Sequence, residues 1–321
     1  MNSIAATAED LARRGQVKDA MNLLERAQQA GDAQAARQLA LWCLSGRWFR
    51  RDLAASRAWF GHAGALGDAQ AAAIHRAFVA NGTGGPADWH GAMDFLSQAA
   101  SDHKAAAEQL GLIAAMLIDG DGDPRSMPYS AALSPDVEVR HFPGFLTVAE
   151  CAYLIAAAAP LLEANVVIDP RSGQMVPHPI RTSHGASFPL VDENPAIHAL
   201  NRRIAAATAS DVRAGEPLQV LRYEPGQEYR PHLDALPGVA AAQQRVLTFL
   251  IALNDDYDGG ETDFPKLGVR FKGKSGDGLM FRNALPDGRA DQRLIHAGMP
   301  VKRGVKYLAS RWIRATPIDL G

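Results

Sequence analysis

The sequence places histidine and carboxylate side chains where they could share a metal ion. His232 and Asp234 lie two residues apart in the segment YEPGQEYRPHLD, residues 223–234. If this segment is extended, both side chains point to the same side of a strand, as two ligands of one ion require. Histidine and aspartate occur at this spacing in many proteins by chance, so the pair alone is a weak indication of a metal site.

Two downstream residues strengthen the metal interpretation. His296 lies 64 residues after His232, and Lys306 follows ten residues later. Two imidazoles and one carboxylate form the ligand set that binds Fe(II) and leaves adjacent coordination positions open. Those positions fit a bidentate 2-oxo acid together with dioxygen. The cation of Lys306 is then the candidate partner for the far carboxylate of the 2-oxo acid.

Each of these residues also has an ordinary structural explanation. His296 could be a loop histidine, and Thr262 could be a plain strand residue. Lys306 could be a solvated cation beside Lys302 and Arg303. Taken singly these explanations are the better ones, but their coincidence in one sequence favours a metal site.

Other catalytic chemistries lack support in the sequence. Cys43 and Cys151 are the two cysteines of the chain, and they stand far apart in apolar contexts. They exclude a disulfide framework and make a thiolate zinc site very improbable. We find no nucleophilic-serine motif, cysteine–histidine pairing signal or phosphate-binding loop. A metal site would therefore have to use histidine and carboxylate ligands.

The elements that position these residues are predicted to be short strands. Apolar and β-branched runs at 217–225, 245–254, 268–272, 277–283 and 305–315 are separated by glycine-rich turns, a pattern typical of a sandwich or jelly roll. Helices are predicted at 147–162 and 193–210. Thr147 and Glu150 have the spacing of a capping box at the start of the first of these helices.

The amino-terminal part has a different period. Residues 1–118 are rich in alanine, and apolar residues recur at helical spacing. The hexapeptide GDAQAA occurs at 31–36 and 67–72, and a weaker copy, SDHKAA, follows at 101–106. We predict stacked helical hairpins, with Gly31 and Gly67 in left-handed positions and Asp32 and Asp68 as caps. The first helices of the hairpins are expected to start at Asp19, Asp52 and Asp88.

These patterns define an α+β chain of two domains. A helical repeat solenoid is expected over 1–118, and a proline- and glycine-rich linker over 119–137. The domain at 138–321 is expected to be a jelly roll, a double-stranded β-helix, with flanking helices.

Composition and charge restrict the partners. Apolar residues make up 47% of the chain, charged residues 21%, and the net charge is −2. This balance gives no support to a nucleic-acid or membrane partner. The first residues lack the apolar run of a secretory signal, so a cytoplasmic location is expected.

Both parts of the chain resemble known families. The amino-terminal repeats are similar to the Sel-like class of tetratricopeptide-related repeats, which implies a protein-binding or self-association scaffold. Residues 138–316 resemble the prolyl 4-hydroxylase group of Fe(II)- and 2-oxoglutarate-dependent dioxygenases. The matching segments, in family order, are RTSHG at 181, LQVLRYEPGQEYRPHLD at 218, RVLTFLIALND at 245, GGETDFP at 259 and HAGMPVKRGVKYLASRW at 296.

The resemblance implies a role for particular residues. The iron ligands would be His232, Asp234 and His296. Lys306, Tyr223 and Thr262 would hold 2-oxoglutarate. The peptide groove would be lined by Arg181, Ser183, Glu216, Tyr229 and Arg245. Three positions depart from the family. Ala252 replaces a common aromatic residue, Phe188 stands where the family often has a bulkier aromatic or aliphatic pair, and Arg314, a further candidate substrate residue, replaces a frequent histidine.

The expected activity is hydroxylation of a prolyl residue in a peptide or protein, with release of succinate and CO2. Fe(II), 2-oxoglutarate and O2 would be required, with ascorbate as a possible reductant, and no catalytic acid, base or nucleophile of the protein is needed. One alternative is hydroxylation of a free amino acid or small metabolite. Another is a repeat-based scaffold whose oxygenase domain is a slow sensor of oxygen or 2-oxoglutarate. The repeats could recruit a protein substrate or simply dock on and stabilise the second domain.

Overall fold

The chain forms two compact units. The computed structural model describes residues 3–168, 175–177 and 180–319. The first unit holds residues up to Asp123 together with Leu190–Ala199, and the second holds Pro124–Pro189 and Leu200–Asp319. The division at 123 falls inside the segment 119–137. The return of residues 190–199 to the first unit was not predicted; it follows from Leu190 and Val191, which pack against a core cluster of that unit.

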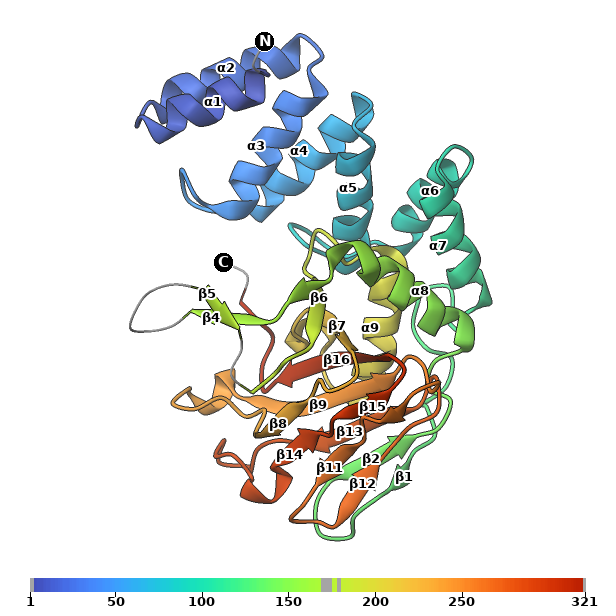
Figure 1. The fold of residues 1–321 in the computed structure, drawn as a ribbon. Helices are drawn as coiled ribbons and strands as arrows, with labels where there is room; N and C mark the ends of the chain where they lie inside the picture. Colours follow the sequence, from blue (N-terminus) through green and yellow to red (C-terminus); the bar gives the residue numbers. More distant parts are fainter. Residues whose placement is uncertain (1–2, 169–174, 178–179, 320–321) are drawn as a thin grey trace. The chain divides into compact units, whose positions relative to one another are not determined.

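Seven helices make up residues 4–115 of the first unit (Figure 1). They are α1 Ile4–Arg13, α2 Val17–Gln29, α3 Ala33–Ser45, α4 Leu53–Ala65, α5 Ala69–Asn81, α6 Trp89–Ala100 and α7 Lys104–Ala115. Helices α2, α4 and α6 start at intervals of 36 residues, and α3, α5 and α7 at intervals of 36 and 35. This spacing matches the separation of the GDAQAA copies.

The predicted caps explain where the second helix of each pair begins. Asp32 and Asp68 are the N-caps of α3 and α5, and their carboxylates accept hydrogen bonds from backbone N–H groups of the first turn. Gly31 and Gly67 have φ angles of 90° and 97°, which glycine adopts without steric cost. Both parts of this prediction are confirmed. Each cap stabilises its helix by about 1 kcal/mol.

The predicted starts of the first helices are right in two cases of three. Asp52 and Asp88 cap α4 and α6. The expectation for Asp19 is wrong, because α2 begins at Val17 and Asp19 lies within its first turn. An acidic residue there still favours the helix through the helix dipole.

Small residues let helices α4 and α5 approach closely. A Cβ atom added to Gly64 would lie 3.0 Å from both Cα and Cβ of Ala72. Phe60 and Phe78 fill the core between these helices as an edge-to-face pair with ring centroids 5.6 Å apart. Burial of each such ring contributes about 2–3 kcal/mol.

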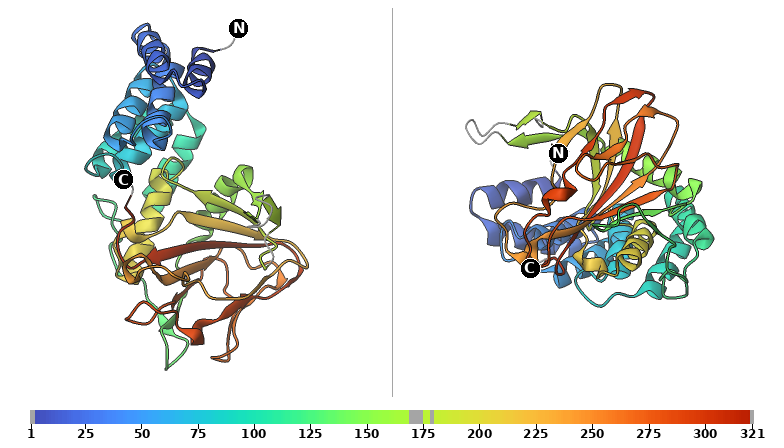
Figure 2. Two further views of the ribbon diagram at one scale, coloured as in Figure 1. Left: turned by 90° about the vertical axis from the view of Figure 1, so that its left-hand side faces the viewer. Right: turned by 90° about the horizontal axis from the view of Figure 1, so that it is seen from below.

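The second unit is built on two antiparallel sheets, seen as two layers in Figures 1 and 2. The larger has eight strands in the order β1-β2-β13-β9-β16-β7-β6-β3, and the smaller has four in the order β12-β11-β14-β8. The eight are β1 Ala131–Ala132, β2 Val139–Phe142, β3 Glu163–Ala164, β6 His184–Phe188, β7 Leu218–Tyr223, β9 Arg245–Ala252, β13 Gly278–Arg282 and β16 Lys306–Arg314. The four are β8 Tyr229–His232, β11 Thr262–Phe264, β12 Val269–Phe271 and β14 His296–Gly298.

Two short ribbons complete the strands, β4 Val166–Ile168 with β5 Met175–Pro177 and β10 Asp258–Gly259 with β15 Val301–Arg303. Single turns of 3-10 helix span Ala159–Leu161, Val212–Ala214, Ala241–Gln243 and Gln292–Leu294. Strand β1 lies within the segment 119–137, so this segment, expected to be loop, contributes an edge strand to the larger sheet.

Helices α8, Val148–Ala158, and α9, Pro195–Thr208, are linked to each other and to the larger sheet. The predicted capping box of α8 is present, with Thr147 and Glu150 each bonded to the backbone of the other. Glu150 also forms an ion pair of 2.7 Å with Arg203 of α9. Arg311 of β16 donates to the Asn201 carbonyl of α9. In the described part of the chain, no helix is both long and apolar enough to cross a membrane.

Candidate metal and co-substrate site

The two candidate histidines face each other across neighbouring strands. His232 ends β8, and His296 begins β14, its direct partner in the ladder. Their ring centroids are 4.3 Å apart. The Nδ1 atom of His232 lies 2.8 Å from the Arg230 carbonyl oxygen, and that of His296 lies 3.0 Å from the Leu294 carbonyl oxygen. A carbonyl accepts Nδ1–H, so both rings have the tautomer that leaves the Nε2 lone pair free for a metal.

Asp234 completes the group. Its carboxylate oxygens lie 3.4 Å from Nε2 of His232 and 3.7 Å from Nε2 of His296. One ligand atom from each of the three residues lies within 4.8 Å of the other two. Burial opposes ionisation of Asp234, but His296, His232 and a hydrogen bond from Thr248 outweigh it and hold its pKa well below the usual range. The carboxyl group is therefore an anion at neutral pH.

Two residues that the sequence did not reveal orient this carboxylate. The Thr248 hydroxyl donates to Oδ2 of Asp234 over 2.7 Å, and Nδ2 of Asn283 donates to the Thr248 hydroxyl over 2.8 Å. All three side chains are buried. Burial also lowers the pKa of His296, which keeps it in the neutral form that binds metal. Two imidazoles and one fixed carboxylate fit a divalent iron ion.

A cavity with an empty volume of about 430 Å³, open solvent at its mouth included, lies beside this group, between the two sheets. Tyr223, Thr262 and Lys306, the candidate co-substrate residues, all line it. Lys306 pairs with Tyr223 across β16 and β7, and its ammonium group lies 5.3 Å from the Tyr223 ring centroid. The ammonium donates to the Gly260 carbonyl oxygen over 2.7 Å. Burial lowers the pKa of Lys306 to about 8, so the group is a cation at neutral pH.

The structure adds apolar walls and one indole to this cavity. Leu221, Leu250 and Leu308 line it, and so does Trp312. Among the described residues, the buried Nε1 of Trp312 has no hydrogen-bond partner. No local sequence signal marks this role, because Trp312 is one of several apolar residues in its strand. A second, smaller cavity is lined by Ala252 and Lys306 among others.

Two of the six candidate substrate residues line the main cavity. Tyr229 stacks on His232 with ring centroids 3.5 Å apart, and the guanidinium of Arg181 lies 5.3 Å from the Tyr229 ring centroid. Burial and the charge of Asp234 raise the pKa of Tyr229 to about 12, so its hydroxyl stays protonated. Arg181 and Tyr229 thus form one wall next to the histidine pair.

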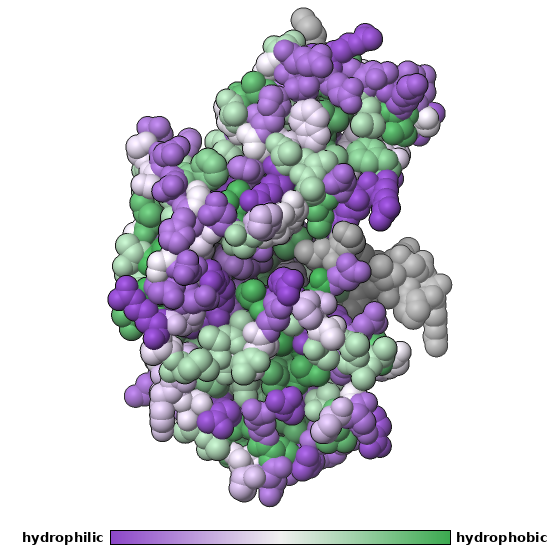
Figure 3. Space-filling model, turned by 180° about the vertical axis from the view of Figure 1, so that it is seen from behind, coloured by the Kyte–Doolittle hydropathy of each residue, from purple (hydrophilic) through white to green (hydrophobic). Residues whose placement is uncertain are grey.

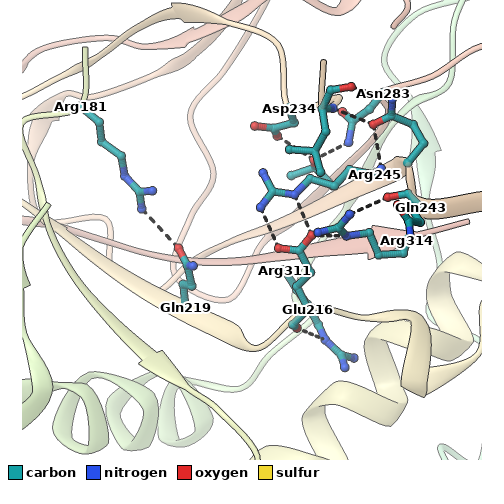
Figure 4. A network of polar contacts seen from close by, with 12 residues as sticks. Arg181, Glu216, Gln219, Asp234, Gln243, Arg245, Asn283, Arg311 and Arg314 are labelled. Carbon is teal, nitrogen blue, oxygen red and sulfur yellow. Dashed lines mark hydrogen bonds and ion pairs between the residues drawn. The ribbon is translucent and has the colours of Figure 1, made fainter. Parts of the chain in front are cut away.

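The other four candidates lie outside the cavity lining. Ser183 is buried and accepts a hydrogen bond of 2.9 Å from Asn165. Arg245 and Arg314 converge on Glu216 (Figure 4). Both bonds from Arg245 to the Glu216 carboxylate are 2.7 Å long.

This network contacts the cavity lining through Trp312. The Arg245 guanidinium lies 3.8 Å from the ring centroid of Trp312. The roles predicted for Ser183, Glu216, Arg245 and Arg314 in substrate binding stay predictions.

One face of the molecule carries hydrophilic and hydrophobic side chains interspersed (Figure 3). The face drawn there thus shows no segregation of hydrophobic from hydrophilic side chains.

Comparison with known proteins supports the same chemistry. The model of the 2OG-Fe(II) oxygenase superfamily matches residues 218–314. Prolyl 4-hydroxylase 1 of Arabidopsis thaliana is 37% identical over 204 residues, which are 58% of this chain and 71% of the relative. Probable prolyl 4-hydroxylase 10 of the same plant is 33% identical over 217 residues, 61% of this chain and 75% of the relative. The solved structure of a viral collagen prolyl hydroxylase from Paramecium Bursaria Chlorella virus-1, in complex with 2OG, is 31% identical to this chain, with a TM-score of 0.47. The match covers 58% of this chain and 100% of the viral one.

Proposed function

Because the chain belongs to the prolyl 4-hydroxylase family of 2-oxoglutarate- and Fe(II)-dependent oxygenases, we propose that it hydroxylates a prolyl residue of a peptide or protein. The enzyme is a dioxygenase that uses Fe(II), 2-oxoglutarate and O2. The products of the co-substrate would be succinate and CO2. The observation that carries the proposal is the cluster of His232, Asp234 and His296 beside the cavity that holds Lys306.

We assign iron binding to His232, Asp234 and His296. When bound, Fe(II) supplies the redox chemistry that activates dioxygen and oxidises a C–H bond. The protein presents two Nε2 atoms and one carboxylate, and Thr248 prevents the carboxylate from rotating away. No acid, base or nucleophile from the chain is needed.

Lys306 would hold the far carboxylate of 2-oxoglutarate. Its ammonium is buried and donates, within the described residues, to the Gly260 carbonyl oxygen alone, so donor capacity remains for an incoming anion. The hydroxyls of Tyr223 and Thr262, both lining the same cavity, can add hydrogen bonds. The leucine walls exclude water, which strengthens each of these polar contacts.

The substrate would lie along Arg181, Tyr229 and Trp312. The indole N–H of Trp312, which has no acceptor within the described part of the chain, offers a donor to a peptide carbonyl oxygen, and the aromatic faces suit a proline ring. This wall is the feature that favours a polypeptide over a free amino acid.

The finer description of the architecture is part of the proposal. We infer that the eight- and four-stranded sheets form a double-stranded β-helix, because the metal group lies between two antiparallel layers. We also infer that α2 to α7 are Sel-like repeats that recruit a polypeptide substrate, on the basis of their 36-residue spacing. A cytoplasmic location and the use of ascorbate stay predictions.

The test begins without oxygen. Fe(II) and 2-oxoglutarate are titrated into the full-length protein, and the visible charge-transfer band of the bound pair is recorded. A proline-rich peptide is then added with O2, and mass spectrometry follows the gain of one oxygen atom. The matched controls are the same peptide with alanine for proline and the protein variant His296→Ala.

We expect hydroxylation of the proline peptide but not of the alanine peptide. We also expect no hydroxylation by the variant His296→Ala. A band without any peptide product, but with hydroxylation of free proline, would contradict the polypeptide substrate. Absence of the band in the unmodified protein would contradict the assigned iron ligands.

A further inference from the structure

The helical unit contains a groove that the oxygenase chemistry does not use. It lies between α4, α5 and α6 and has an empty volume of about 1060 Å³, open solvent at its mouth included. Its floor is made largely of small residues, among them Gly61, Gly64, Ala72 and Ala99. At these positions backbone and Cβ atoms form the lining, so this part of the groove is apolar.

A buried cation lines this groove. Arg76 of α5 is 9% exposed. Its Nε atom is buried and has no hydrogen-bond partner among the described residues. Burial lowers the pKa of Arg76, and no nearby carboxylate offsets the effect. A guanidinium nevertheless stays protonated at neutral pH, so the protein maintains at this position a partly desolvated positive charge that forms no ion pair within the described residues.

The neighbours of Arg76 do not neutralise it. Arg57, also nearby, adds positive charge, and burial together with Arg57 and Arg76 lowers the pKa of His75. His75 is therefore neutral at pH 7. Asp102 lines the groove but is exposed and forms no ion pair with Arg76 within the described residues. Buried charges are normally paired, so an anion from outside the chain is the missing component.

An aromatic wall stands beside this cation. Phe95 of α6 is 42% exposed, although it is a large apolar side chain. Its ring centroid lies 5.4 Å from that of His75. The His75 ring in turn occupies the space over Gly61, where an added Cβ would lie 3.0 Å from Nε2. The groove thus presents a cation and an exposed apolar ring side by side.

We propose that this groove binds an extended acidic peptide segment of a partner protein, with a glutamate side chain paired to Arg76 and an adjacent apolar side chain packed on Phe95. Arg76 as a residue is nine-tenths buried, so the carboxylate reaches its guanidinium on a flexible stem, as a glutamate side chain does, while the peptide backbone stays at the mouth. A bidentate carboxylate contact satisfies the planar guanidinium best. A small free carboxylate would leave most of the apolar groove empty.

The proposal is tested by direct binding to the full-length protein without iron or 2-oxoglutarate, so its outcome is independent of the hydroxylase proposal. The probes are fluorescent, N-acetylated and C-amidated peptides of sequence Gly-Leu-Glu-Leu-Gly and Gly-Leu-Gln-Leu-Gly. A third probe is the glutamine peptide with a free C-terminal carboxylate. Saturable binding of the glutamate peptide, weakened at least about tenfold by glutamine, is expected.

Variants locate the site. Arg76→Met should weaken binding of the glutamate peptide at least about tenfold, and the exposed Arg50→Met serves as the matched control. Gln98→Glu covers the case in which Arg76→Met fails to fold. It changes an exposed residue of the groove and adds a competing carboxylate, so it should also weaken binding.

Three results would overturn the proposal. The first is that the C-amidated glutamate and glutamine peptides bind with equal affinity, or that neither shows saturable binding. The second is binding of the free-acid glutamine peptide alone, which would identify a chain terminus as the ligand. The third is full affinity in Gln98→Glu or in a folded Arg76→Met variant.

Discussion

Replacement of Lys306 by methionine should weaken 2-oxoglutarate binding and stabilise the fold at the same time. Methionine has a similar length and no charge, so it removes the cation without opening a large cavity. Loss of one member of a buried, hydrogen-bonded charge pair costs about 2–5 kcal/mol. This cost corresponds to a dissociation constant for 2-oxoglutarate about 30- to 3,000-fold higher, at about 1.4 kcal/mol per factor of ten.

The stability effect follows from the buried charge. The pKa of Lys306 falls from its ordinary 10.5 to about 8 because of burial. At about 1.4 kcal/mol per pKa unit, the buried cation costs the folded state about 3 kcal/mol at neutral pH. Lys306→Met also loses the hydrogen bond to the Gly260 carbonyl, which offsets about 1 kcal/mol of the stability gained by removing the charge. The free energy of unfolding of Lys306→Met should therefore be about 2 kcal/mol above that of the unmodified protein.

The sign of the pH dependence gives a further check. Between pH 8 and 10.5 the unfolded lysine still holds its proton while the folded one has lost it. The unfolded state binds more protons, so the stability of the unmodified protein contains a contribution that rises with pH across this window. Lys306→Met should lack that contribution.

Calorimetry of 2-oxoglutarate binding to the iron-loaded, oxygen-free protein measures the first effect, and urea denaturation at pH 7 and pH 10 measures the second. Iron affinity, from competition with a chelator, should change less than about threefold, because Lys306 is not among the three assigned ligands. The exposed Lys302→Met is the matched control. Equal losses of iron and 2-oxoglutarate affinity, or a lower unfolding free energy in Lys306→Met, would refute the reasoning.

Three further outcomes are expected. Thr248→Val removes the donor that holds the buried carboxylate, so iron affinity in chelator competition should fall about 10- to 100-fold; unchanged affinity would show that the carboxylate is fixed by other means. Raising the pH above about 8 deprotonates Lys306 in the free enzyme, so 2-oxoglutarate affinity measured by calorimetry should fall about tenfold per pH unit, and a flat profile would contradict this. Gly215→Ala places a Cβ 2.2 Å from Cζ of the buried Arg311 and should lower the unfolding free energy by about 1–3 kcal/mol, whereas Gly111→Ala, in an open helical position, should raise it slightly. Thermal denaturation checks this: Gly215→Ala should have a lower melting temperature than the unmodified protein and Gly111→Ala a slightly higher one, and the reverse order would contradict the prediction.

The sequence predicted the parts of the site whose residue types are distinctive. The two-residue spacing of His232 and Asp234 predicted a common face on one extended strand, but β8 ends at His232 and Asp234 lies in the bend that follows. The structure places His296 opposite His232 in the ladder. Such a long-range pairing could be inferred only through the family resemblance, since nothing local to His296 specifies its partner strand. The caps at Asp32 and Asp68 were predictable because capping depends on a few neighbouring residues.

The residues that sequence reasoning missed act through tertiary contacts. Thr248 lies in an apolar strand, where threonine is an ordinary β-former, and its bond to Asp234 joins different elements. Arg76 lies in an alanine-rich helix, where an arginine usually faces solvent. Its burial depends on how α4 and α6 pack against α5, which no local pattern encodes.

The two sheets each supply different residues of the site. His232 and His296 belong to the four-stranded sheet, whereas Lys306 and Tyr223 belong to the eight-stranded sheet. Asp234 follows a strand of the small sheet but is oriented by Thr248 of the large one. A local opening that separates the sheets would thus remove the carboxylate from its donor while leaving the histidine pair and the lysine each on an intact ladder. The rate of iron loss to a strong chelator then measures how often the two layers separate, and 2-oxoglutarate, which would span both, should slow that rate.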